Sequence, residues 1–255
     1  MRGSVEDSAG RIVATNAASS GRGPRLVSRV TDEKLRGTYW PYALSRAITL
    51  AALAIAITFS QDHSATFGLA AFAVFAFISS VIGVIFVRSA ARMFRPARVL
   101  IAQSVVSAAA AVIAGSLVVV DLSGALGAGG ASSAGVGIRS LLVVLAGWAA
   151  ITGSLDVFLG LRSRGRHPGA NDWLSMGAFT MLAALVFVLL PPDIRQQFVG
   201  EQKVSGVLDS AIITVGLLGA YAAISAVFLV IAALSARWAK DALDPASPVT
   251  ESESQ

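Results

Sequence analysis

Six apolar blocks, each long enough to cross a lipid bilayer, run through this chain. They cover residues 43–59, 66–87, 99–120, 138–161, 173–190 and 207–234. A helix rises 1.5 Å per residue, so about 20 residues cross a hydrocarbon core of about 30 Å. No periodic polar face interrupts the blocks, which argues against the core helices of a soluble protein. The sequence therefore predicts an all-α integral membrane protein with six transmembrane helices.

The composition agrees with this prediction. Hydrophobic residues make up 55% of the 255 residues, charged residues only 14%, and the mean hydropathy is +0.71. Soluble domains carry about 25% charged residues. Lipid, rather than water, is therefore the expected solvent for most of the chain.

Polar segments flank and separate the blocks. Residues 1–42 predict a flexible basic cytoplasmic extension and residues 237–255 a disordered cytoplasmic tail, on either side of a membrane domain at 43–236. Residues 121–137 predict a flexible loop, and the polar segment at 193–206 an amphipathic turn at the membrane interface. The seven Lys and Arg residues of the extension favour contact with anionic lipid.

Basic residues indicate the orientation of the helices. Of the 20 Lys and Arg residues, 17 fall on the side that holds both termini, and the other three are Arg139, Arg195 and Lys203. Cytoplasmic loops carry an excess of Lys and Arg. The sequence thus predicts a multi-pass protein of the cell membrane with both termini in the cytoplasm.

A short pattern recurs at equal spacing. It reads Trp148-Ala-Ala-Ile-Thr-Gly, returns as Tyr221-Ala-Ala-Ile-Ser-Ala, and returns more loosely as Phe75-Ala-Phe-Ile-Ser-Ser. Both separations are 73 residues, which favours three tandem two-helix hairpin repeats. The alternative is chance similarity between low-complexity helices, combined with the bias in basic residues.

The segment around the middle copy, Ala146 to Pro192, resembles a known family. The likeness rests on Trp148, Ile151-Thr152-Gly153, Arg162-Ser163-Arg164, Trp173 and Pro191-Pro192. In these features the chain resembles the HdeD-like acid-resistance membrane proteins, which are built from short hairpin repeats and have no assigned biochemical role. The resemblance covers roughly a fifth of the chain. It implies a six-span inner-membrane protein linked to stress or acid tolerance, with no family active site to transfer.

Asp156 is the main candidate for a functional residue. It lies five residues from the predicted cytoplasmic end of its helix, about 8 Å inside the apolar region. The equivalent positions of the other two repeats hold Gly83 and Leu229. An acid at this depth predicts either a proton-binding group in a cavity or a carboxylate paired with Arg46 or Arg162 to fix helix packing.

Two further polar residues fall inside the predicted spans. Arg46 lies one turn into the first span, where its side chain is expected to extend back to the headgroups, and a functional intramembrane charge is the alternative. Gln103 in the third span is expected to share a cavity with Asp156 or to form a hydrogen bond between helices. At the opposite side of the membrane, Asp121 and Arg139 are expected to form a structural ion pair.

The sequence offers no catalytic constellation. It has no cysteine, and its two histidines, His63 and His167, fall in loops without metal-ligand spacing, so we expect no cofactor and no metal. Without a usable base we expect no enzyme activity. A pI near 10.2 is explained by the membrane orientation and requires no nucleic acid.

These observations predict a non-enzymatic membrane protein of the HdeD-like type, acting as a structural or accessory component in stress or acid tolerance. Its expected partners are the lipid bilayer and other membrane proteins or further copies of itself. The alternative is a small transporter or channel that is proton-linked through Asp156.

Overall fold

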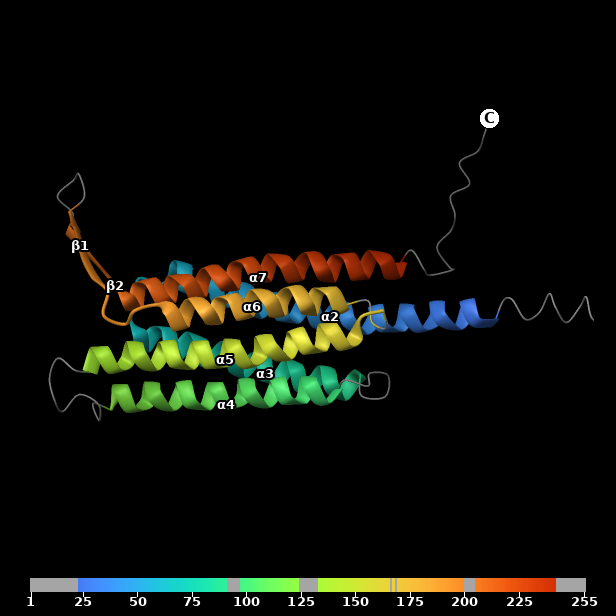
Figure 1. The fold of residues 1–255 in the computed structure, drawn as a ribbon, viewed down its shortest axis with the longest axis horizontal. Coiled ribbons are helices and arrows are strands. Elements are labelled where there is room, and N and C mark those ends of the chain that lie inside the picture. The colour runs from blue at the N-terminus through green and yellow to red at the C-terminus, as the bar shows by residue number, and fades with distance from the viewer. Residues whose placement is uncertain are drawn as a thin grey trace, which may run out of the picture.

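The computed structural model describes residues 23–90, 97–123, 133–165, 167, 169–199 and 205–241. These residues form a bundle of long helices with one small β-hairpin (Figure 1). In chain order the elements are α2 (Gly23–Phe59), α3 (Ala65–Ala90), α4 (Ala97–Leu122), α5 (Ser133–Ser163), α6 (Ala170–Leu189), β1 (Arg195–Val199), β2 (Ser205–Asp209) and α7 (Ser210–Asp241).

Six helices among the described residues are long and apolar enough to cross a membrane, as the sequence predicts. Their apolar parts are Tyr39–Phe59, Ala65–Arg88, Arg98–Leu122, Gly137–Ser163, Ala170–Leu189 and Ser210–Ala239. Large apolar side chains also cover the outside of the bundle; Phe59, Val112 and Val143 are each more than two-thirds exposed. Exposed apolar surface on this scale needs lipid around it, which indicates an integral membrane protein.

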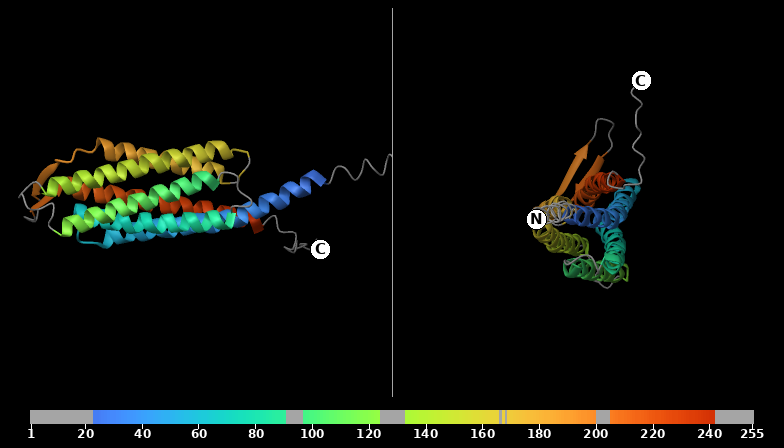
Figure 2. Two further views of the ribbon diagram at one scale, coloured as in Figure 1. Left: turned by 90° about the horizontal axis from the view of Figure 1, so that it is seen from below. Right: turned by 90° about the vertical axis from the view of Figure 1, so that its right-hand side faces the viewer.

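The helices form a closed ring in chain order. Each contacts the next, and α7, the last, packs along α2, the first. The most extensive contacts join α5 to α6, α2 to α7 and α3 to α4. In addition α3, α5 and α7 contact one another across the ring. The end-on view shows the helices side by side, seen along their lengths (Figure 2).

The first helix is longer than the sequence predicts. The chain is already helical from Gly23 and passes through Pro41 without leaving the helix, so residues 23–42 are not the flexible segment expected of them. The N-terminal part of α2 extends beyond the other helices (Figure 2). Residues 1–22 lie outside the described part of the chain. The last helix likewise runs to Asp241, past the predicted start of a disordered tail, and residues 242–255 are outside the description.

A β-hairpin stands where the sequence predicts an amphipathic turn. Strands β1 and β2 pair antiparallel, with Arg195 opposite Asp209 and Val199 opposite Ser205. The hairpin stands at one end of the bundle, and the start of α2 and the end of α7 lie at the other (Figure 1). Its polar backbone is paired within the hairpin, which removes the need for a helix in this segment.

Glycines allow α5 and α6 to approach very closely. A Cβ atom added at Gly177 would stand 2.6 Å from the backbone nitrogen of Val157 and 2.9 Å from the Cβ of Asp156. One added at Gly153 would stand 2.9 Å from the backbone nitrogen of Met181. Only glycine fits such backbone contacts, as in other membrane helix pairs with small residues at the interface. This close packing fixes the segment of α5 that carries Asp156.

Candidate functional site

The three polar residues predicted inside the spans meet in the interior of the bundle. Arg46 extends from α2, Gln103 from α4 and Asp156 from α5. The Arg46 Nη2 atom lies 3.4 Å from Asp156 Oδ2, and Gln103 Nε2 donates a hydrogen bond of 3.1 Å to Asp156 Oδ1. Both carboxylate oxygens therefore have a donor.

Burial makes this pairing necessary. Asp156 is only 1% exposed, and the side chain of Arg46 is 18% exposed. A carboxylate taken out of water without a partner costs several kcal/mol, and a paired one costs much less. The Arg46 guanidinium also lies 5.7 Å from the centre of the Tyr42 ring, a cation–π distance. The cluster thus compensates its own charge inside an apolar bundle.

The expected orientation of Arg46 is wrong. Its side chain turns inward to Asp156 and does not extend back to the headgroups. The competing partner, Arg162, lies exposed near the end of α5. An arginine one turn inside a span can reach the headgroups only if no stronger partner is nearer, and here Asp156 is nearer.

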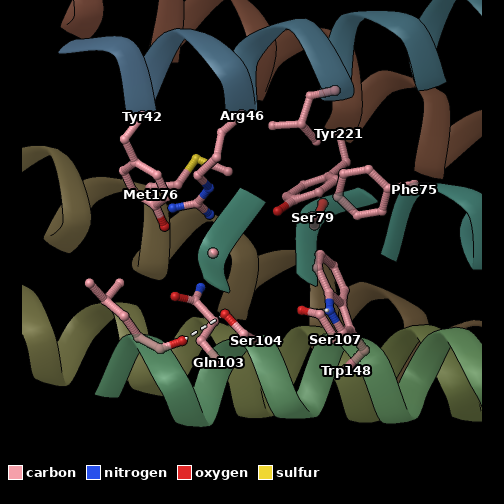
Figure 3. Close-up of a pocket in the computed structure, with 13 residues that line it drawn as sticks. Tyr42, Arg46, Phe75, Ser79, Gln103, Ser104, Ser107, Trp148, Met176 and Tyr221 are labelled. Carbon is pink, nitrogen blue, oxygen red and sulfur yellow. Dashed lines mark hydrogen bonds between the residues drawn. The ribbon is translucent and has the colours of Figure 1, made fainter. Parts of the chain in front are cut away.

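A small cavity of about 40 Å³ lies beside the cluster, on the axis of the bundle. Residues from all six helices line it. They are Tyr42, Arg46, Leu50, Phe75, Ser79, Gly83, Leu100, Gln103, Ser104, Ser107, Trp148, Met176 and Tyr221. Figure 3 shows the Arg46 and Gln103 side chains reaching toward each other from opposite walls. A cavity needs about 10–15 Å³ to hold one water molecule, so this one has room for a few waters and not for an organic solute.

The aromatic residues that begin the three occurrences of the recurring sequence pattern meet at this cavity. Phe75, Trp148 and Tyr221 all line it, and the rings of Phe75 and Trp148 pack edge to face with centroids 5.5 Å apart. Trp148 Nε1 donates to Ser107 Oγ at 3.3 Å, and the Tyr221 and Thr180 hydroxyls are 2.8 Å apart. The polar atoms of Trp148 and Tyr221 thus each form a hydrogen bond with a side chain of another helix.

An apolar layer separates the cavity from the end of the bundle that carries the β-hairpin. About two turns from the cavity, Gly68, Leu141 and Val215 meet where α3, α5 and α7 are in contact. A Cβ added at Gly68 would stand 2.8 Å from Val215 and 2.9 Å from Leu141. Leu141 and Val215 are fully buried, so this layer closes the centre of the bundle on that side.

The ion pair expected between Asp121 and Arg139 is replaced by two other contacts. Asp121 accepts a hydrogen bond from the hydroxyl of Thr66 at the start of α3. Arg139 Nη2 lies 3.6 Å from Oδ2 of Asp193, in the segment that follows α6. Both members of this second pair are largely exposed, so it adds little stability.

A second polar and aromatic group, missed by the sequence reasoning, lies at the opposite end of the bundle. Tyr39 donates to Asp172 Oδ2 at 3.0 Å and packs edge to face on Trp173, with ring centroids 5.6 Å apart. The ring centroids of His167 and Trp173 lie 4.6 Å apart, so His167 packs against Trp173 and is not a freely solvated loop residue. The sequence feature that could have indicated this group is the presence of aromatic residues at the starts of the first and fifth spans.

The described residues contain no group of three or more His, Asp or Glu side chains placed to hold a metal ion. Comparisons with protein-family models, with curated proteins and with solved structures found no match.

Proposed function

We propose that this chain is a non-enzymatic, multi-pass component of the cell membrane, of the HdeD-like type, that acts as a structural or accessory protein in stress or acid tolerance. Its partners in this role are other membrane proteins or further copies of the chain. The family and the role are inferences from the sequence resemblance.

The observation that carries the structural part of the proposal is the complete pairing of Asp156. Arg46 and Gln103 occupy both carboxylate oxygens, and the adjoining cavity has room only for a few waters. Buried polar groups that are fully paired serve to specify one helix arrangement. A cluster of this kind supports a scaffold better than it supports a solute pathway.

The proposal includes the orientation and the repeat. Three hairpin units with both termini in the cytoplasm account for the basic residues at one end and for the meeting of Phe75, Trp148 and Tyr221. Reporter fusions at Gly130 and at the C-terminus should report opposite sides of the membrane. Reports from the same side would overturn the orientation.

The accessory role can be tested in cells. A strain that lacks the gene should survive acid or heat poorly, and the wild-type gene should restore survival. The double variant Arg46→Met/Asp156→Leu should restore it equally, because a scaffold needs packing and not charge. A deletion strain that is indifferent to both stresses, together with a mild-detergent pull-down without partners, would contradict the proposal.

A second candidate function is proton-linked transport through Asp156. The observation that favours it is the cavity beside the Arg46–Asp156 pair, which is large enough for water and lined by all six helices. In liposomes with a pH-sensitive dye, this function requires faster proton flux than empty liposomes show. Asp156→Asn should abolish that excess, and equal fluxes from wild type and variant would exclude Asp156 as the proton site.

A further inference from the structure

A groove separates two helices that are consecutive in the chain. Helices α6 and α7 make little contact, whereas each packs closely on another neighbour, α6 on α5 and α7 on α2. The space left between α2, α6 and α7 measures about 210 Å³. Its lining is formed by Tyr39, Asp172, Phe228, Ile231, Ala232, Ser235 and Ala236.

The two ends of this lining differ in chemistry. The wall from α7 is an apolar stripe with helical spacing, from Phe228 through Ile231 and Ala232 to Ala236. Asp172, in the first turn of α6, supplies a carboxylate at the end of the groove. Ile231 is 60% exposed, so the apolar wall is open to the surroundings of the bundle, which for a membrane helix are lipid.

Asp172 lacks a cationic partner among the side chains that the structure describes. The salt bridges formed by these side chains join Arg46 to Asp156 and Arg139 to Asp193. Tyr39 donates to Oδ2 of Asp172, and the described side chains form no hydrogen bond to its Oδ1 atom. The helix dipole also favours a carboxylate in the first turn of a helix. Asp172 alone therefore does not indicate a ligand, and the groove beside it is the second observation.

The depth of the groove matches a phospholipid. Asp172 and Tyr39 lie at the ends of their apolar helix segments, the level at which headgroups meet the protein. The apolar stripe continues from there toward the middle of the bilayer. A volume of 210 Å³ is smaller than the 300–1,000 Å³ or so of a complete drug-sized pocket, but it accommodates part of an acyl chain.

We propose that this groove binds a phospholipid with a primary-amine headgroup, whose ammonium group pairs with Asp172 while part of one acyl chain lies along the α7 stripe. Charge complementarity selects this occupant. A primary ammonium donates hydrogen bonds to a carboxylate, a quaternary ammonium cannot donate, and a glycerol headgroup carries no positive charge. The inference depends on the membrane arrangement of the helices and not on the role in stress tolerance.

Native mass spectrometry of the full-length protein, purified in detergent, tests the proposal. The probes are phosphatidylethanolamine, phosphatidylcholine and phosphatidylglycerol with identical acyl chains. We expect about fivefold greater retention of the ethanolamine lipid than of the other two, the ratio that corresponds to one partly solvated ion pair. Equal retention of the three lipids would overturn the proposal.

Two variants and one control identify the groove as the site. Asp172→Asn should lower retention of the ethanolamine lipid to the level of the choline lipid, whereas Asp193→Asn, at the other end of the bundle, should leave it unchanged. Ser235→Phe, at an exposed position of the lining, should reduce retention by filling the groove. If Asp172→Asn fails to fold, Ser235→Phe decides the question, and unchanged retention in that variant would refute the site.

Discussion

Arg46 and Asp156 join opposite sides of the bundle. They are 110 residues apart in the sequence, yet Arg46 Nη2 lies 3.4 Å from Asp156 Oδ2. In the ring formed by the six helices, α2 and α5 are three steps apart, so neither is the other's neighbour. The ion pair therefore links helices that ring packing alone does not hold together.

Removing only one member of this pair should destabilise the protein strongly. Asp156→Leu leaves the Arg46 guanidinium buried without a counter-charge, at an expected cost of about 3–5 kcal/mol in the free energy of unfolding. Arg46→Met should have a similar effect. The double variant should recover most of the loss because no unpaired charge remains. SDS titration in mixed micelles measures all three, and additive single effects would contradict the coupling.

Gln103→Leu should have a smaller effect in the same direction. The substitution removes the amide that donates to Asp156 Oδ1 and leaves the ion pair with Arg46 in place. A hydrogen bond to a charged group contributes about 1.5–3 kcal/mol. Ser116→Ala serves as the control, because its hydroxyl bonds only to the backbone of its own helix on an exposed face. Equal unfolding midpoints for the two variants would contradict the role given to Gln103.

Gly177→Ala should loosen the contact between α5 and α6. The new methyl group would overlap the backbone of α5 next to Asp156, and overpacking of this kind costs about 1–3 kcal/mol. Gly115→Ala is the matched control, since no atom stands within 4 Å of the added Cβ and alanine is the better helix former. Unfolding midpoints of both variants in detergent decide the matter, and equal midpoints would contradict the close contact.

The exposed pair Arg139–Asp193 should contribute almost nothing. Its side chains are 65% and 74% exposed, and solvent ions screen such pairs. We expect Arg139→Ala to change the free energy of unfolding by less than about 1 kcal/mol, with no difference remaining in high salt. A larger loss that persists in high salt would indicate that Arg139 has a further structural role.

Helix positions were predictable because apolar length alone determines which segments can cross a bilayer. Asp156 stood out in the sequence because it is a charge inside an apolar span, at the position where the other occurrences of the recurring pattern hold Gly83 and Leu229. The sequence did not predict which arginine pairs with it. The choice between Arg46 and Arg162 depends on the order of the helices around the ring, which no single helix encodes.

The β-hairpin and the helical start of α2 were missed for different reasons. The segment beginning at Arg195 is only a few residues long and mixes polar with apolar side chains, so its periodicity was too short to separate strand from turn. The residues after Gly23 are polar, and their helix continues a transmembrane segment that supplies its nucleus. Helix formation there therefore propagates from the neighbouring span.

The contact between α2 and α7 has a consequence for how the protein is made. Helix α2 precedes the other described helices in the chain, and its most extensive packing is with α7, which follows all of them. Until α7 has been synthesised, α2 lies in the bilayer with its largest interface uncovered, and until α5 has been synthesised, Arg46 lacks Asp156. Any premature stop codon before α7 leaves that interface permanently open, so quality control has a simple feature by which to distinguish unfinished chains.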